Sequence, residues 1–316
     1  MTLNSSGPIS LGGATTGQSI NLEIGAAATT QVSLNDTNVR LLAQVPTGQI
    51  TMPTNFWGKK FSANSATIFM MGGGGNAGTG GNPGGGGQMI IPTTVSVTGG
   101  VAYSVVVGGS GSGSSVFNGA YTAIAGGGGG SWTGSNAENC TNGGNGACGG
   151  AGGYGLVPGS ACSGGTGTYG GNGGTPAYYS NGIQVTWSCA AGSGGLGGSG
   201  TSASIVGNPY GSGSLYGGNG GAPLYSTFNS SSSSIAYGGG IGGSACVISD
   251  GPNTRCYHGS TTGTPAANTG YGGYSGVVII RVSNAFPQPA STGSPTIVNS
   301  GGWYWFTFTG SGTITF

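Results

Sequence analysis

Residues 70–87 read MMGGGGNAGTGGNPGGGG, and this run decides how the rest of the chain is to be understood. Glycine loses more backbone entropy on ordering than any other residue and offers no side chain to bury, so such a run ordinarily marks a linker or a disordered segment. Strand-forming sequence nevertheless flanks it, with SATIFMM at 65–71 and QMIIPTTVSV at 88–97. The glycine runs are therefore either flexible linkers between folded segments or an ordered framework in their own right.

The composition is that of neither an ordinary enzyme nor a disordered chain. Of the 316 residues, 78 are glycine and only 3% are charged, whereas an ordinary globular domain carries roughly 25% charged residues. Disordered chains combine low hydrophobicity with high net charge, but here the formal net charge is +1, and the 14 Tyr, 9 Phe and 5 Trp require burial or contact. Collagen is excluded because the glycines fall in runs without an every-third-residue register.

Two classes of partner are not expected. A nucleic-acid partner is not expected because the five basic residues are too few and too scattered to neutralise several phosphates. Membrane insertion is not expected because no apolar stretch approaches the ~20 residues that span a bilayer. The N-terminus also lacks the basic and apolar regions of a signal peptide. The basic residues are Arg40, Lys59, Lys60, Arg255 and Arg281.

Residues 1–60 form a module with an almost ordinary pattern. In SINLEIG at 19–25, apolar residues alternate with polar ones, which predicts a half-buried strand. The segment NDTNVRLLA at 35–43 carries a short apolar stripe after residues that favour helix caps, which predicts a short helix. A turn at 46–48 and a brief strand are expected to follow.

Residues 61–283 begin and end with strands. Alternating apolar residues predict a strand over VAYSVVV at 101–107, and the continuous apolar run GVVIIRV at 276–282 predicts a strand covered on both faces. Between them, glycine clusters such as GGNGACGGAGG at 143–153 alternate with polar and aromatic inserts. Extended glycine helices of the polyglycine II type approach closely enough to hydrogen-bond one another, which favours a framework. Flexible loops on a small β-domain are the alternative.

Residues 284–316 combine a proline-containing linker with the segment WYWFTFTGSGTITF at 303–316. Its alternation places Trp303 and Trp305 on one face and Phe306 and Phe308 on the other, and GSG supplies a turn, which together predict a β-hairpin. Such an apolar hairpin is expected to pair with another part of the chain or with a neighbouring subunit. The expected fold is therefore mainly β, with a small N-terminal module, a glycine-rich β domain with polyglycine II-type segments, and a C-terminal β-hairpin.

The succession of strand and glycine motifs resembles the glycine-rich domain of bacteriophage tail-fibre and adhesin proteins. The motifs that carry the resemblance are ATIFMMGGGGN, TTVSVTGGVAYSVVVGG, SSVFNGAYTAIAGGGGG and GYGGYSGVVIIRV. Residues 1–60 resemble a module that opens many phage tail and virion structural proteins, and FTFTGSGTITF resembles a strand pair found beside the glycine-rich domain. Residues 131–265 follow no family pattern, so no binding residue is transferred onto them.

The resemblance implies a tail-fibre or baseplate-associated protein in the virion tail. Residues 1–60 would attach to other virion proteins, and residues 61–283 would present variable loops to a host receptor, either a glycan or an outer-membrane protein. Because tail fibres are commonly trimeric, the C-terminal strands would complete a neighbouring subunit's sheet in a homotrimer. The alternative is a purely structural virion component, such as a collar, connector or decorating protein.

Catalysis is not expected, and neither is a metal or a cofactor. The sequence has one histidine, His258, and four carboxylates, Glu23, Asp36, Glu138 and Asp250. A triad of Asp250, His258 and a serine is a coincidence that serine-rich loops generate freely, and nothing brings Glu138 and Asp250 together as a glycosidase pair. The scarcity of acids also counts against a surface-glycan depolymerase.

The six cysteines are interpreted as candidate disulfides. They lack the short paired spacings of zinc sites, and a virion works in an oxidising setting in which bridges stabilise a fold with a thin core. Pairing between sequence neighbours is preferred, because each bridge would close one insert onto its own glycine segment; unpaired buried thiols are the alternative. The residues are Cys140, Cys148, Cys162, Cys189, Cys246 and Cys256.

Aromatic residues in the inserts are the candidate receptor contacts. They stand among Ser, Gly and Asn, a composition that also suits antibody contact loops, and aromatic faces stack on sugars or protein side chains at low entropic cost. The alternative is that they pack over the glycine framework. The candidates are Trp132, Tyr178, Tyr179, Trp187, Tyr210, Tyr216, Tyr225, Phe228, Tyr257 and His258.

Overall fold

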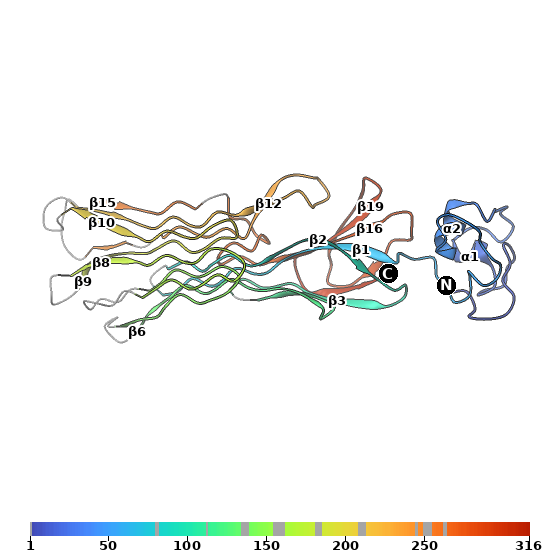
Figure 1. The fold of residues 1–316 in the computed structure, drawn as a ribbon, viewed down its shortest axis with the longest axis horizontal. Coiled ribbons are helices and arrows are strands. Elements are labelled where there is room, and N and C mark those ends of the chain that lie inside the picture. Colours follow the sequence, from blue (N-terminus) through green and yellow to red (C-terminus); the bar gives the residue numbers. More distant parts are fainter. Residues whose placement is uncertain are drawn as a thin grey trace.

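The computed structural model confirms a mainly β fold and has three parts along its long axis. Figure 1 shows a small N-terminal module at one end, a pair of β-sheets next to it, and a long bundle of extended segments that reaches the far end. None of the described helices is long and apolar enough to cross a membrane. The structure describes residues 2–79, 82–111, 113–133, 139–153, 162–180, 185–207, 213–243, 246–248, 255–261 and 264–316.

The N-terminal module contains two short helices, α1 (Ile20–Glu23) and α2 (Thr37–Ala43). Helix α2 confirms the helix predicted at 35–43. The strand predicted at 19–25 is wrong, because Ser19 caps α1 by accepting a hydrogen bond from the backbone N–H of Leu22. The brief strand predicted after residues 46–48 is also absent, since turns occupy 52–58.

Asn21 explains why α1 is not a strand. The side chains of Ile20 and Asn21 are both completely buried, although a strand would point them to opposite faces. Asn21 Nδ2 donates to the carbonyl oxygens of Ala27 (3.1 Å) and Thr30 (2.7 Å), so it closes the following loop. A buried polar residue that closes a loop gives the sequence the same apolar–polar alternation as a strand residue that faces solvent.

Two five-stranded sheets form the middle of the molecule. The first has the order β18 (Thr296–Ser300), β19 (Trp303–Phe308), β16 (Val277–Ser283), β1 (Ser65–Met71), β2 (Met89–Ser96). The second has the order β17 (Ala290–Ser291), β20 (Gly312–Thr315), β3 (Ala102–Val106), β4 (Ser115–Phe117), β5 (Tyr121–Ala123). The strands predicted at 65–71, 101–107 and 276–282 are thus confirmed as β1, β3 and β16.

Apolar side chains from both sheets meet in one core. The first sheet contributes Ile68, Ile280 and Phe306, and the second contributes Tyr103 and Ile314. The opposite face of the first sheet is covered as well, by the hairpin of β12 (Leu224–Ser226) and β13 (Ile235–Tyr237). This arrangement confirms that the segment at 276–282 is buried on both faces.

The predicted C-terminal hairpin is wrong in its pairing. Strand β19 pairs with β16 and β18, whereas β20 pairs with β3 and β17, so the GSG segment at 310–312 passes from one sheet to the other. The predicted alternation is nevertheless confirmed, since Phe306 and Phe308 enter the core and Trp305 faces the opposite side. Crossing between sheets lets both strands bury apolar residues in one core, which an isolated hairpin cannot do.

The glycine runs are folded, and their hydrogen bonds have a period of three. The N–H groups of Cys148 and Ala151 donate to the carbonyls of residues 86 and 83, those of Gly149 and Gly152 to residues 171 and 174, and those of Gly150 and Gly153 to residues 144 and 141. Each third residue therefore bonds to the same neighbouring segment, as three-residue helices packed side by side require. This pattern confirms polyglycine II-type segments.

We call this assembly the glycine lattice. Its described segments extend alongside one another from the sheets to the far end of the molecule (Figure 1). Asparagine side chains extend the pattern, because Asn145 Oδ1 accepts from the N–H of Thr166 (2.7 Å) and Asn219 Oδ1 accepts from the N–H of Ser260 (2.8 Å). The lattice comprises 72–79, 82–87, 108–111, 125–130, 141–153, 162–174, 190–202, 217–223, 238–243, 259–261 and 270–273.

Candidate functional site

Short strands cap the glycine lattice at the end opposite the N-terminal module (Figure 1). We call this end the distal tip. It consists of three small sheets, and glycine segments lead into and out of them. The strands are β6 (Trp132–Thr133) with β7 (Asn139–Cys140); β8 (Ala177–Ser180), β9 (Val185–Cys189) and β14 (Cys246–Ile248); and β10 (Ser204–Gly207), β11 (Gly213–Tyr216) and β15 (Arg255–Tyr257).

Most of the predicted contact residues belong to the distal tip. Strands of the tip include Trp132, Tyr178, Tyr179, Trp187, Tyr216 and Tyr257, and His258 directly follows β15. Tyr179 lies opposite Trp187 in the register of β8 and β9. Tyr210 lies outside the described residues. The tip therefore brings together inserts that are more than a hundred residues apart in the sequence.

Tyr216 and Tyr257 form an exposed aromatic pair at the tip. They are neighbours on the parallel strands β11 and β15, and their rings are stacked with centroids 5.0 Å apart and an interplanar angle of 8°. The two side chains are 41% and 42% exposed, and the adjacent His258 is exposed as well. Stacked rings held on strands offer a flat, pre-ordered apolar surface with hydroxyl groups at its edge.

Tyr225 and Phe228 are not part of the tip. They lie in and beside β12, next to the first sheet. Tyr225 is 62% exposed, whereas Phe228 is only 9% exposed and packs edge-on against Trp305, with ring centroids 5.1 Å apart. Phe228 is thus a packing residue, but it covers the first sheet and not the glycine framework that the alternative interpretation named.

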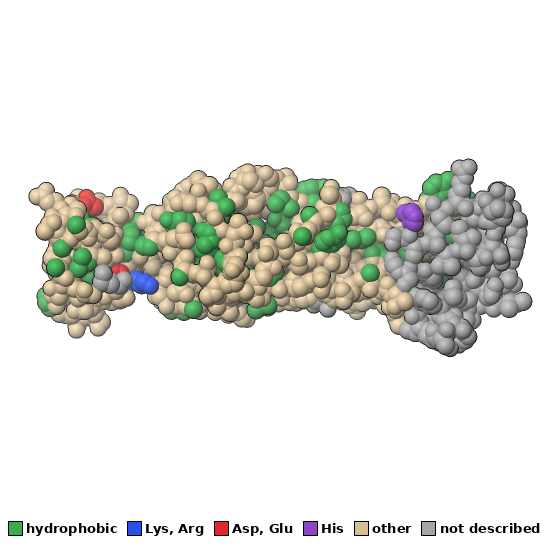
Figure 2. Space-filling view, turned by 180° about the vertical axis from the view of Figure 1, so that it is seen from behind, with side chains coloured by type: hydrophobic (Ala, Val, Ile, Leu, Met, Phe, Trp, Pro, Cys, Tyr) green, Lys and Arg blue, Asp and Glu red, His purple; other side chains and the backbone are tan. Residues whose placement is uncertain are grey.

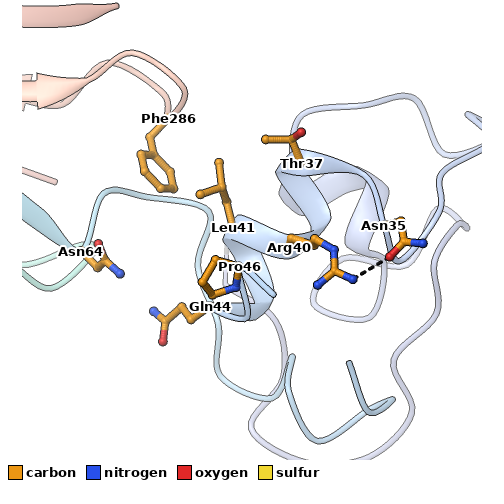
Figure 3. Close-up of a pocket in the computed structure, with 8 residues that line it drawn as sticks. All are labelled: Asn35, Thr37, Arg40, Leu41, Gln44, Pro46, Asn64 and Phe286. Carbon is orange, nitrogen blue, oxygen red and sulfur yellow. Dashed lines mark hydrogen bonds between the residues drawn. The ribbon is translucent and has the colours of Figure 1, made fainter. Parts of the chain in front are cut away.

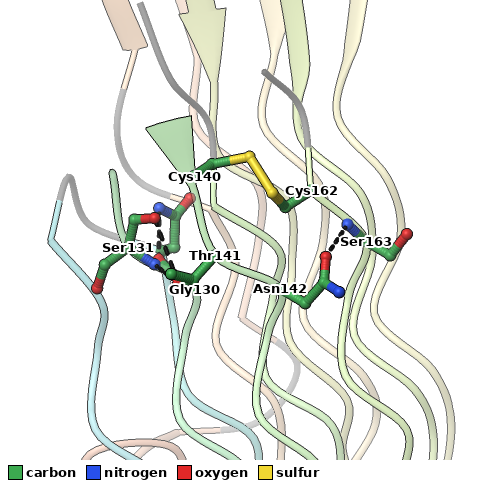
Figure 4. Close-up of a disulfide and its surroundings, with 8 residues drawn as sticks. Gly130, Ser131, Cys140, Thr141, Asn142, Cys162 and Ser163 are labelled. Carbon is green, nitrogen blue, oxygen red and sulfur yellow. Dashed lines mark hydrogen bonds between the residues drawn. A yellow bond between two sulfur atoms is a disulfide. The ribbon is translucent and has the colours of Figure 1, made fainter. Parts of the chain in front are cut away.

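A disulfide joins Cys140 to Cys162, with a Cα–Cα distance of 5.9 Å. Figure 4 shows it linking the end of β7 to Cys162, at the start of the glycine segment 162–174. Beside it, Asn142 Oδ1 accepts from the N–H of Ser163 (3.0 Å). The predicted preference for sequence neighbours is wrong at this bridge, because Cys148 lies between the two partners.

The other four cysteines lie in the lattice or in strands of the tip, and Cys148 differs from the bridged pair. The side chains of Cys148 and Cys189 are completely buried, and Cys148 is a free thiol, so the expectation of six oxidised cysteines is wrong for Cys148. Burial raises the pKa of the Cys148 thiol to about 12. Cys189 lies opposite Cys246 in the register of β9 and β14. The side chains of Cys246 and Cys256 lie outside the described residues.

Cys148 is expected to resist alkylation in the folded protein. With its pKa near 12 the reactive thiolate is scarce near pH 8, and the lattice excludes the reagent. Iodoacetamide treatment followed by peptide mass analysis should leave Cys148 unmodified under native conditions and modify it fully in concentrated guanidinium chloride. Cys140 and Cys162 serve as the control, since they should react only after reduction. Rapid native labelling of Cys148 would contradict its place in the lattice interior.

A cavity of about 370 Å³ lies where the N-terminal module meets the sheets. Figure 3 shows Phe286 and Leu41 lining it from opposite sides, while Arg40 donates to Asn35 Oδ1 at 2.6 Å. Arg40 also donates to the backbone carbonyl of Val45, so its guanidinium is engaged in holding the module together. No acid or histidine belongs to the described lining. We interpret this cavity as a gap in the packing between the N-terminal module and the sheets.

The residues that the structure describes contain no cluster of three or more histidine, cysteine or acidic side chains that would hold a metal. On the face shown in Figure 2, the Lys, Arg, Asp and Glu side chains lie on the N-terminal module, and a histidine lies towards the opposite end. No protein-family model, curated protein or solved structure matches the chain.

Arg281 lies at a second candidate site and was not among the residues predicted from the sequence. It interrupts the apolar run of β16 and lies among Phe228, Trp303 and Trp305, all within cation–π distance. The signal was available, because a charged residue in a strand that is buried on both faces requires a partner. Its aromatic partners come from segments distant in the sequence.

Proposed function

We propose that the protein is a phage tail adhesin that binds a host surface structure through its distal tip and attaches to the virion through residues 1–60. One observation carries the proposal: the aromatic inserts gather at one end of a long lattice, and the N-terminal module occupies the other end. A receptor-binding protein requires this separation of attachment and recognition. The resemblance of the sequence motifs to phage tail-fibre proteins points to the same role.

The lattice supports this role mechanically. Because successive N–H groups bond to different neighbouring segments, the segments are cross-linked sideways in more than one direction, unlike the strands of a single sheet. Such a bundle resists bending and holds the tip at a fixed distance from the virion. The described strands of the distal tip lie outside the lattice segments, so their sequence can vary without changing the hydrogen bonds of the lattice.

The tip also favours the adhesin over a purely structural virion component. A collar or connector has no need for exposed aromatic rings at its free end, whereas Tyr216 and Tyr257 present such rings. Contacts of this kind are enriched among residues whose truncation costs about 2 kcal/mol or more of binding free energy. We therefore expect adsorption to depend on this pair.

The test is adsorption of virions that carry Tyr216→Ser with Tyr257→Ser. The expected result is an adsorption rate at least about 10-fold lower, with normal incorporation into particles, because the variant loses the stacked surface. Tyr225→Ser is the matched control, since it removes an exposed tyrosine away from the tip and should leave adsorption unchanged. Unaltered adsorption in the tip variant would favour the structural component.

A further inference from the structure

A groove of about 560 Å³ lies beside the first sheet, away from the distal tip. We call it the Arg281 groove. One wall is the turn between β12 and β13. The other wall is the start of β19 together with the turn that precedes it. Its described lining comprises Pro92, Ser226, Thr227, Phe228, Ser230, Ser232, Arg281, Ser300, Gly301, Trp303 and Trp305.

The strand register places Arg281 in this groove. Side chains of β16 alternate, so Arg281 faces the same side as Ile279, which packs under the β12–β13 hairpin. Arg281 lies opposite Trp305 in the neighbouring strand β19. Its guanidinium carbon is 4.3 Å from the ring centroid of Trp303, 5.3 Å from that of Trp305 and 5.0 Å from that of Phe228.

Within this aromatic cage, one hydrogen-bond donor of Arg281 lacks a partner. Its Nε is buried and donates to no acceptor. Burial also lowers the pKa of the guanidinium, because desolvation penalises the charged form. Ring faces attract the cation but accept its N–H bonds poorly, whereas a carboxylate accepts two of them side by side.

The rest of the lining suits a sugar. Trp303 presents an aromatic ring in a groove with room for a small ligand, and such rings stack on the apolar faces of pyranoses. The hydroxyl groups of Thr227 and Ser232 lie in exposed residues on the rim. A guanidinium with an unpaired Nε–H, a flat aromatic surface and hydroxyl groups on the rim together match a saccharide that carries a carboxylate.

We propose that the Arg281 groove binds an acidic saccharide, with the uronate carboxylate on Arg281 and a sugar ring against Trp303. This site is separate from the distal tip, so either proposal stands if the other fails. A structural clasp, in which Arg281 only fastens the β12–β13 hairpin to the sheet, is the competing account. This account predicts that substitutions in the groove change the free energy of unfolding and that the groove binds no acidic saccharide.

The experiment uses the full chain with ¹⁵N-labelled tryptophan and follows the indole N–H signals during titration, with Trp303→Phe for assignment. The probes are tetragalacturonate, its methyl ester and tetraglutamate. We expect saturable shifts of Trp303 and Trp305 with tetragalacturonate. The affinity should be at least about 10-fold lower for the ester, because a charged hydrogen-bond partner is lost. Equal binding of tetraglutamate would overturn the assignment to a saccharide.

Variants separate binding from stability. Arg281→Gln should abolish the shifts, whereas Lys60→Gln, which removes a cation from another part of the chain, should not. Thr227→Asp covers the case in which Arg281→Gln does not fold, because a carboxylate on the rim repels the uronate while leaving Arg281 in place. Absence of indole shifts in the unaltered protein, or undiminished affinity in the folded Thr227→Asp variant, would overturn the proposal.

Discussion

Gly150→Ala is expected to lower the free energy of unfolding by about 3 kcal/mol, the upper end of the cost of overpacking. A Cβ at Gly150 would lie within van der Waals overlap of the backbone of Gly128, 1.9 Å from its carbonyl oxygen and 2.5 Å from its carbonyl carbon. Both obstacles are backbone atoms, so no side-chain rotation relieves the clash. Thermal melting should shift downward by about 6–12 °C in a body of this size.

Gly128→Ala is the matched control, because the two glycines face each other across the same pair of segments. The nearest atom to a Cβ at Gly128 is the carbonyl oxygen of Asn76, at 3.7 Å, which is ordinary contact. We expect little change in melting, or a slight gain from the reduced entropy of the unfolded chain. If the two substitutions melted alike, the glycine lattice as described would be wrong.

Truncation after Ser283 is expected to destroy the sheets and not merely to change the oligomeric state. It removes β17, β18, β19 and β20, so β16 and β3 each lose the strands that pair with them on one side. Phe306 and Phe308 leave the core with it, and each buried Phe→Ala change alone costs about 3–5 kcal/mol. Since a domain is stable by only about 5–15 kcal/mol, loss of cooperative melting and aggregation are expected.

Calorimetry and light scattering together check this prediction. Ile297→Ala in the outer strand β18 is a useful comparison, since that side chain is 38% exposed and its loss should cost far less. A truncated chain that melts cooperatively as a monomer would show that the C-terminal strands are dispensable. The homotrimer stays a prediction, but these strands pair within their own chain.

The strands were predictable wherever burial left a regular pattern. The alternation of residues 303–308 predicted which side chains share a face, and the apolar run at 277–280 predicted a strand buried on both faces; both were confirmed. The pairing of β19 and β20 was not predictable, because GSG at 310–312 suits a tight turn as well as a crossing between sheets. Helix α1 was not predicted because Asn21 is polar, which suggests a surface position, whereas its buried side chain closes a loop by hydrogen bonds.

The sequence predicted the aromatic character of the candidate site, but only part of its location in the fold. Aromatic inserts between glycine runs indicated a display surface, and the strands of the distal tip gather most of them. Phe228 was misplaced because an exposed and a buried aromatic residue look alike among serines. Arg281 was missed because Trp303 and Trp305 lie on another strand, and local sequence does not report such contacts.

The threefold repeat of the lattice limits how such a molecule can change in length. Inserting one or two residues into a glycine segment would point every later N–H group at the wrong neighbouring segment. Inserting three residues would keep each later N–H group pointed at its original neighbour. With a rise of about 3.1 Å per residue, adjoining segments would lengthen together in steps of about 9 Å. The length of the lattice therefore changes in fixed steps, and relatives with longer or shorter lattices should differ by multiples of three residues in each glycine segment.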